Sequence, residues 1–249
     1  MDAPEGWWYE LGGGRQWGIV IAVVGTGVAR ESTDPDSGIH IVDHPDLVQL
    51  PASRLTQYGG HAGTGSRDPA RYHGGYPKPN ETPKRPEAWK HETKVASIIA
   101  ARTNNALPIG SMAGGIWAGQ HKVYPVQVRM VWDDANQRYG FYQSAINNGL
   151  YCVGIMDGIF RGASFRYDIA VLNMSFGLEG HDCTEARLLY NHLSPNMVCI
   201  ASAGNGGKDT KHHPTAIATH RKCLGFESTV DYVLGVGASN QNGYLAPWS

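Results

Sequence analysis

The chain has 249 residues, of which 41% are hydrophobic and 17% are charged, so it can bury a sizeable core and is not disordered. Its formal net charge of −1 gives no electrostatic reason to expect nucleic acid or an anionic membrane as a partner. No apolar run is long enough to cross a bilayer, and the first residues, MDAPEGWWYE, show no signal peptide, which leaves the compartment open.

Short runs rich in valine and isoleucine recur along the chain, as is typical of buried parallel strands. They span residues 18–24, 38–43, 121–128, 168–175, 196–203 and 230–238. Apolar residues at helical spacing lie between several of these runs, at residues 90–105, 140–160 and 183–194. The alternation predicts one α/β domain over residues 1–249, in which helices cover both faces of a mainly parallel sheet.

Two long stretches, residues 51–90 and 206–229, are rich in loop-forming residues and show no periodicity. Loops of that length usually serve binding, and we interpret residues 51–90 as a loop insertion. The second stretch contains His212, His213, His220 and Cys223, whose spacing matches no standard zinc site and favours a solvated loop.

The four cysteines are far apart and show no Cys-x-x-Cys spacing. Cys152 and Cys199 lie in apolar runs, so we expect buried thiols there. Cys183 and Cys223 lie in polar loops and could pair, although the sequence does not fix this connectivity.

The run at 18–24 continues into Gly25-Thr26-Gly27, which is part of a dinucleotide-binding fingerprint. The third glycine of that pattern is Arg30 here, and Asp43 lies near the position of the ribose-binding acid. The fingerprint also requires a helix directly after the turn, and the segment ARESTDPDSG is too short and too rich in turn formers to supply one. A dinucleotide-binding enzyme that uses Gly25 and Gly27 stays as a weaker alternative.

Several segments resemble those of subtilisin-like serine proteases (subtilases), and they occur in the same order as in that family. The segments are IAVVGTGV at 21–28, DHPDL at 43–47, HETKVASIIAARTNN at 91–105, DIAVLNMSFG at 168–177 and CIASAGN at 199–205. The resemblance implies a three-layer α/β/α fold with a mainly parallel sheet. It also implies an endopeptidase that cuts peptide or protein substrates with a Ser/His/Asp triad.

The resemblance assigns roles to individual residues of this chain. His91 takes the position of the general base, and Asn205 that of the side chain that donates to the oxyanion. The backbone of Ser175, Phe176 and Gly177 would pair with the substrate as an added strand. The pocket for the residue before the cut would be lined by Ser202, Ala203 and Gly204.

A structural calcium ion is also implied, because the family binds one with the aspartate of His-Pro-Asp-Leu and an asparagine after the histidine helix. Asp46 and Asn105 fit those positions. A turn aspartate and a helix-capping asparagine explain the same residues equally well, and the loop ALPIG carries an extra residue.

Three departures from the family pattern bear on activity. Gly25 stands where the family has its catalytic aspartate, and glycine offers no substitute acceptor for His91. Asp43 could reach inward, but nothing in the sequence requires it. The residues at the family's glycine and second histidine after His91 are Glu92 and Lys94, which we expect to alter the field of the site. The family's Gly-Thr-Ser-x-Ala segment does not occur, and GSMAG around Ser111 is a poor match in the wrong place.

We therefore expect a subtilase-type domain that lacks its C-terminal portion and is inactive by itself. A second chain or segment could complete it. The alternative in another functional class is a pseudoprotease that binds peptides or proteins without cutting them.

Overall fold

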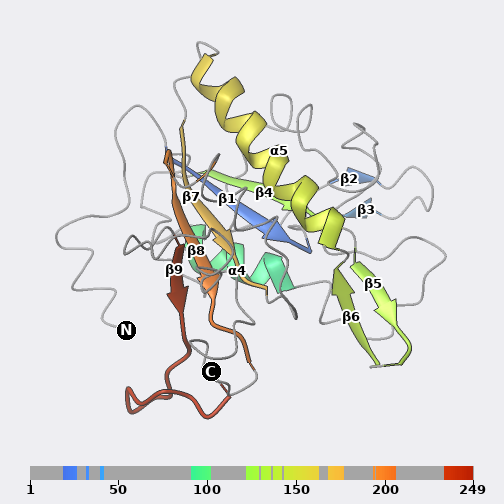
Figure 1. Ribbon diagram of the computed structural model, residues 1–249, viewed down its shortest axis with the longest axis vertical. Coiled ribbons are helices and arrows are strands. Elements are labelled where there is room, and N and C mark those ends of the chain that lie inside the picture. The colour runs from blue at the N-terminus through green and yellow to red at the C-terminus, as the bar shows by residue number, and fades with distance from the viewer. Residues whose placement is uncertain are drawn as a thin grey trace, which may run out of the picture. The chain divides into compact units, whose positions relative to one another are not determined.

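The computed structural model describes residues 19–26, 32–33, 40–41, 91–101, 122–128, 130–135, 137–141, 143–162, 168–176, 193, 195–205 and 233–248 (Figure 1). The chain divides into two compact units, Met1–Ile169 and Ala170–Ser249.

The first unit is built on two parallel strands, β1 (Ile19–Gly25) and β4 (Lys122–Gln127). Their register runs from the pair Val20 and Lys122 to the pair Gly25 and Gln127. Successive β1 side chains point to opposite faces, yet residues 20–24 are all buried. Burial on both faces explains why this strand is a continuous apolar run rather than an alternating one.

Two helices pack against these strands, α4 (His91–Ala100) and α5 (Gln143–Gly162). In α5 the buried side chains of Ile146, Leu150 and Val153 recur at helical spacing and form its core-facing stripe. The buried Asp157 carboxylate follows on this helix and accepts a hydrogen bond from the backbone N–H of Ile169 at 3.2 Å. This bond fixes the end of α5 to the start of β7 (Asp168–Met174).

The structure contains two antiparallel strand pairs that the sequence analysis does not predict. β2 (Ser32–Thr33) pairs with β3 (His40–Ile41), so the predicted parallel strand at 38–43 is wrong: it is a short antiparallel strand. β5 (Met130–Asp133) pairs with β6 (Arg138–Phe141), and Asp133 Oδ1 accepts the Ala135 N–H at 3.0 Å in the turn between them. Helix α5 confirms the predicted helix at 140–160, but it begins at Gln143, after this hairpin, rather than at residue 140.

The second unit contains parallel strands: β7 pairs with β8 (Val198–Ser202), and β8 pairs with β9 (Val233–Val236). The side chains of Leu172 and Met174 on β7 and of Cys199 on β8 are buried. After β9 an Asn240 turn follows, in which the Asn240 side chain accepts the backbone N–H groups of Asn242 and Tyr244.

The fold is α/β with a mainly parallel sheet, as the sequence predicted, and the strands observed at 19–25, 122–127, 168–174, 198–202 and 233–236 confirm the predicted runs. Helix 91–100 confirms the predicted one at 90–105. The predicted helix at 183–194, apart from the buried Leu193, and the loop at 51–90 lie outside the described residues. Among the described helices, none has the length and apolar character of a membrane span.

Candidate active site

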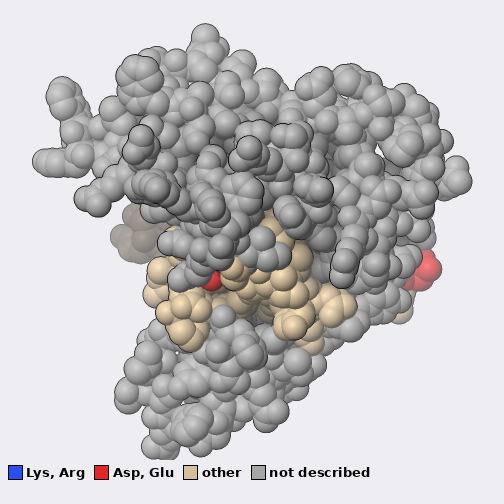
Figure 2. Space-filling view, turned by 90° about the horizontal axis from the view of Figure 1, so that it is seen from above, with Lys and Arg blue, Asp and Glu red and all other residues tan. Residues whose placement is uncertain are grey.

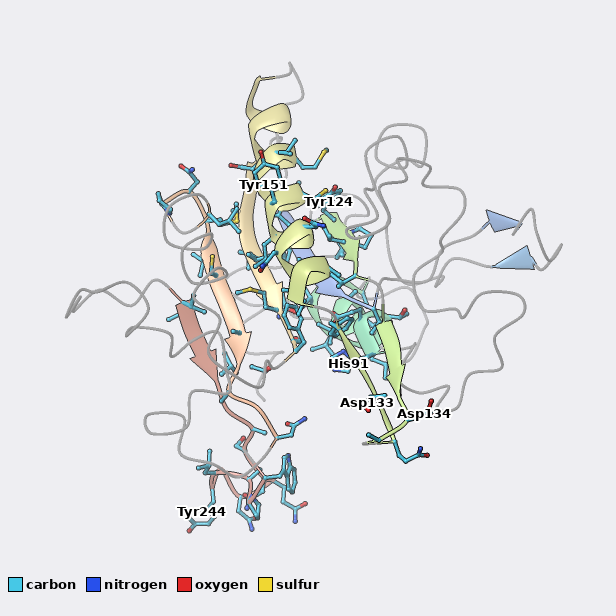
Figure 3. The ribbon with its side chains drawn as sticks, turned by 45° about the vertical axis from the view of Figure 1, so that its right-hand side comes forward. His91, Tyr124, Asp133, Asp134, Tyr151 and Tyr244 are labelled. Carbon is cyan, nitrogen blue, oxygen red and sulfur yellow. The ribbon has the colours of Figure 1, made fainter. Side chains whose placement is uncertain are left out.

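The end of strand β1 meets the beginning of helix α4. Thr26 directly follows β1, and its side-chain oxygen accepts the backbone N–H of Glu92 at 3.1 Å. The first N–H groups of a helix have no partner within the helix, so this contact caps α4 from a residue 66 positions earlier in the chain. It places His91, the first residue of α4, at the carboxyl end of a parallel strand (Figure 3).

The side chain of Glu92 fills the space beside Gly25. A Cβ atom added at Gly25 would overlap the Glu92 carboxyl group and would lie 2.6 Å from its Cγ. Glu92 is buried, with 1% of its side chain exposed. The carboxylate therefore occupies the volume that any side chain at position 25 would need.

His91 and Glu92 form a carboxylate–imidazole pair. His91 Nδ1 lies 3.1 Å from Glu92 Oε1, and the His91 side chain is 49% exposed. Glycine at position 25 offers no acceptor for His91, and Glu92 supplies one, whereas Asp43 lies outside the described residues. The Glu92 substitution was visible in the sequence, but we interpreted it only as an extra charge near the site.

The pair shifts the protonation of both groups. The hydrogen bond to Glu92 raises the pKa of His91 above its ordinary value, against the opposing effects of burial and of the Lys94 charge. Burial raises the pKa of Glu92, and the contact with His91 opposes that shift. Since both groups hold a proton more tightly than they would in water, the pair favours states that keep one proton between them.

The second unit carries the other predicted site residues that the structure describes. Ser202 Oγ donates to the Phe176 carbonyl at 3.1 Å, and the Ala203 N–H donates to the Val236 carbonyl at 2.8 Å. Gly204 has a φ of 102°, a left-handed conformation that favours glycine, and it turns the chain into the exposed Asn205. The segment 202–205 is thus fixed at the carboxyl end of β8.

Ser175 Oγ is hydrogen-bonded to Asn173 Oδ1 at 2.9 Å, and Gly177 lies outside the described residues. His91 belongs to the first unit and Asn205 to the second, so their meeting across one cleft stays a prediction.

The predicted calcium ligands Asp46 and Asn105 lie outside the described residues, as do Cys183 and Cys223. Within the described parts of the chain, no three His, Cys, Asp or Glu side chains gather as a metal site would require. Cys199 is a buried free thiol, as predicted, and Cys152 is half-buried.

The dinucleotide interpretation fits this geometry poorly. Residues 32–33 are strand β2, where the required helix would have to run, and the Glu92 carboxylate lies against Gly25, where a pyrophosphate would approach. On the face shown in Figure 2, the described residues in view are mostly uncharged and include isolated acidic atoms, with no basic side chain among them.

These features define an α/β domain with a carboxylate–imidazole pair at the carboxyl end of a parallel strand. The model of the subtilase family matches residues 16–249, and the chain belongs to this family of proteases.

Two solved structures are similar to the chain. The prenylagaramide maturation protease PagA is 18% identical with a TM-score of 0.52, over 100% of this chain and 63% of PagA, so the chain spans less than two thirds of that protein. The psychrophilic subtilisin-like protease Apa1 from Pseudoalteromonas sp. AS-11 is 20% identical with a TM-score of 0.49, over 96% of this chain and 39% of Apa1. At this identity PagA supports the fold alone. No curated protein matches the chain.

Proposed function

We propose that this chain supplies the general base and the oxyanion-binding asparagine of a subtilisin-type serine endopeptidase. The observation that carries the proposal is His91 at the start of α4, with Nδ1 bonded to a buried carboxylate. Because Nδ1 is engaged and the ring is half-exposed, Nε2 is the nitrogen that can exchange a proton with a reacting group. Family membership supports the assignment.

The reaction then follows the general scheme of acyl transfer. A serine hydroxyl oxygen bonds to the peptide carbonyl carbon while its proton passes to His91 Nε2. The carbonyl oxygen becomes an oxyanion, and the Asn205 amide donates to it; removing the equivalent amide from subtilisin costs roughly 10²–10³ in kcat. His91 then returns the proton to the leaving amine as the C–N bond breaks, and water repeats the sequence to release the acid.

The substrate would be an extended peptide or protein segment. The backbone from Ser175 onward follows strand β7 and would add the substrate as a further strand. The small residues Ser202, Ala203 and Gly204 would leave room for a large side chain before the cut. The hydrogen bond from Ser202 to Phe176 supports this role, since it joins the two segments that would form the groove.

The 249 residues contain no Gly-Thr-Ser-x-Ala segment, so we expect them to be inactive by themselves. The same observation favours one other candidate, a pseudoprotease that binds peptides or proteins without turnover. In the first case a further segment or second chain supplies the serine; in the second none does.

The test compares the 249 residues with the gene product at its natural length, using a fluorophosphonate serine probe and an extended fluorogenic peptide. We expect no labelling of the 249 residues, labelling and turnover by the natural gene product, and loss of turnover in its His91→Ala variant. A gene product that binds the peptide without labelling or turnover would establish the pseudoprotease instead. Stoichiometric labelling of the 249 residues would overturn our assignment of the nucleophile.

A further inference from the structure

The carboxylate beside His91 comes from an unexpected place. Adjacent residues of a helix point about 100° apart and do not normally face each other. Here His91 is exposed and Glu92 is buried, yet Nδ1 and Oε1 lie 3.1 Å apart. The Glu92 carboxyl group lies against Gly25, and from there Oε1 also reaches Nδ1 of His91 at the first helical position.

The absence of a side chain at position 25 makes this arrangement possible. A Cβ there would overlap the Glu92 carboxyl group, so a side chain at position 25 and the Glu92 side chain exclude each other. The two departures from the family pattern, glycine in place of aspartate at 25 and glutamate in place of glycine at 92, are therefore one structural change. The aspartate is lost from the strand, and a carboxylate arrives in the same volume from the helix.

The surroundings of Glu92 are compatible with an ionised form that acts on His91. A buried carboxylate is costly unless it is paired, and Glu92 has His91 as its partner. It also lies in the first turn of α4, a helix of ten residues, where the helix dipole stabilises negative charge. Burial works against the ionised form, because the second oxygen, Oε2, is buried and has no hydrogen-bond partner among the described residues. The contact with His91 is therefore the one shown there that stabilises the charge.

We propose that Glu92 is the positioning residue of His91, and that it takes over from a different backbone element the work of the aspartate missing at Gly25. This inference rests on the proposed function for its catalytic consequence, but the pairing itself is a property of the folded chain. As an acceptor at Nδ1, Glu92 would hold the imidazole with its proton on Nδ1, leave Nε2 to accept the proton of a nucleophile, and stabilise the imidazolium that forms.

The first test needs no variant and no turnover. Nitrogen-15 chemical shifts of His91 in the unmodified protein report which ring nitrogen holds the proton and how the ring titrates. We expect neutral His91 to carry its proton on Nδ1 and to have a pKa above the ordinary histidine value. A neutral ring with its proton on Nε2, or a ring that titrates as an isolated histidine, would overturn the proposal whether or not the protein is a protease.

The second test changes the carboxylate. Glu92→Gln keeps the shape and an acceptor oxygen but removes the charge, so the pKa of His91 should fall. Asp134→Asn is the matched control, because it removes one acidic charge from the exposed turn between β5 and β6 of the same unit and should leave His91 unchanged. The Lys94 charge, which lowers the pKa of His91, is present in both proteins. An equal response of His91 to both variants would contradict a specific role of Glu92.

The third test moves the carboxylate back to the strand. Gly25→Asp combined with Glu92→Gly should restore the raised pKa of His91, and it decides the question if Glu92→Gln does not fold. Gly25→Asp alone should destabilise the protein, because both carboxylates compete for one volume. A double variant that folds but leaves His91 with an ordinary pKa would refute the exchange.

In the natural gene product, Glu92→Gln should lower kcat by about 10⁴-fold, the loss known for the corresponding change in a serine protease triad. It should leave KM little changed, because a positioning residue does not touch the substrate. A response of His91 without any turnover in the natural gene product would refute the proposed function and leave the pairing intact.

Discussion

Replacing Gly25 with alanine adds a single methyl group at the most crowded point of the site. The new Cβ would overlap the Glu92 carboxyl group, so one of two things must happen. If Glu92 stays, the overpacked contact strains the end of β1 and costs about 1–3 kcal/mol. If Glu92 withdraws, the hydrogen bond to His91 is lost, which costs about 1 kcal/mol because the half-exposed ring is partly screened by solvent.

Both routes destabilise the protein by about 1–3 kcal/mol. For a chain of this size, that corresponds to a fall in Tm of roughly 2–12 °C. The assay is thermal unfolding of Gly25→Ala, followed by far-ultraviolet circular dichroism, with His91 titration by NMR on the same samples. If Glu92 withdraws, the pKa of His91 returns towards its ordinary value; if Glu92 stays, the pKa remains raised and the loss of stability is larger.

Gly140→Ala is the matched control, because Gly140 is also a strand glycine of the same unit, and an added Cβ there meets nothing within 4 Å. Glu92→Ala supplies the second arm of a double-mutant cycle. Once the glutamate side chain is gone, the overlap disappears and only the backbone strain of a side chain at the Gly25 φ of 159° remains. Gly25→Ala should then cost less than in wild type, which gives a coupling of about 1 kcal/mol or more between the two positions. The placement of Glu92 against Gly25 is refuted if Gly25→Ala behaves like Gly140→Ala, or if its cost is the same with and without Glu92.

Individual contacts give three further predictions. The raised pKa of His91 means that the stability from its bond to Glu92 is complete below the ordinary histidine pKa of 6.5 and is lost as the pH rises through the raised folded-state pKa. The raised pKa of Glu92 acts in the same direction, so the Tm of wild type relative to Glu92→Gln should fall as the pH rises through the folded-state pKa values of the pair, and a rise would contradict the pairing. Burial raises the pKa of Cys199 to about 12, so its thiolate fraction at pH 8 is about 10⁻⁴. Iodoacetamide should therefore alkylate Cys199 only after the protein unfolds. Fast labelling of the folded protein would show that the thiol is exposed. Ser202→Ala removes the hydrogen bond to the Phe176 carbonyl and should lower the free energy of unfolding by about 0.5–1.5 kcal/mol. Ser239→Ala, at an exposed serine, is the control and should have little effect. Equal Tm values for the two variants would argue against the hydrogen bond.

The parallel strands could be predicted from the sequence because a strand that is buried on both faces needs apolar residues at successive positions. Residues 20–24 are buried without interruption, and the sequence there is apolar without interruption. The β5–β6 hairpin was missed because its strands are short, and the last two residues of β6 were assigned to the start of the helix predicted at 140–160. The signals that could have identified it were the Asp-Asp-Ala-Asn turn and the aromatic residues on both sides.

Only part of the site, His91, could be predicted from the sequence. His91 was found because its neighbours in the sequence follow a family pattern, and its place at the start of α4 is a local property of the chain. The role of Glu92 depends on a contact between residues 66 positions apart, the bond from its N–H to Thr26 that lays the first turn of α4 on the end of β1. Each of the two substitutions, at 25 and at 92, indicates a damaged site when taken alone. Their overlap in space is the observation on which we propose that one compensates for the other.

The move of the carboxylate from strand to helix changes what holds the pair together. When acid and base come from different elements, their separation depends on how the helix packs against the strand. When both come from successive residues of α4, the separation is set within the first turn of one helix, and a small shift of α4 along β1 would carry both groups together. What the packing must still provide is an empty volume beside Gly25 for the Glu92 side chain. Selection on such a site would therefore act on the small size of residue 25 rather than on any chemistry that this residue performs. Glycine at position 25 would then be required because it leaves room for the Glu92 side chain.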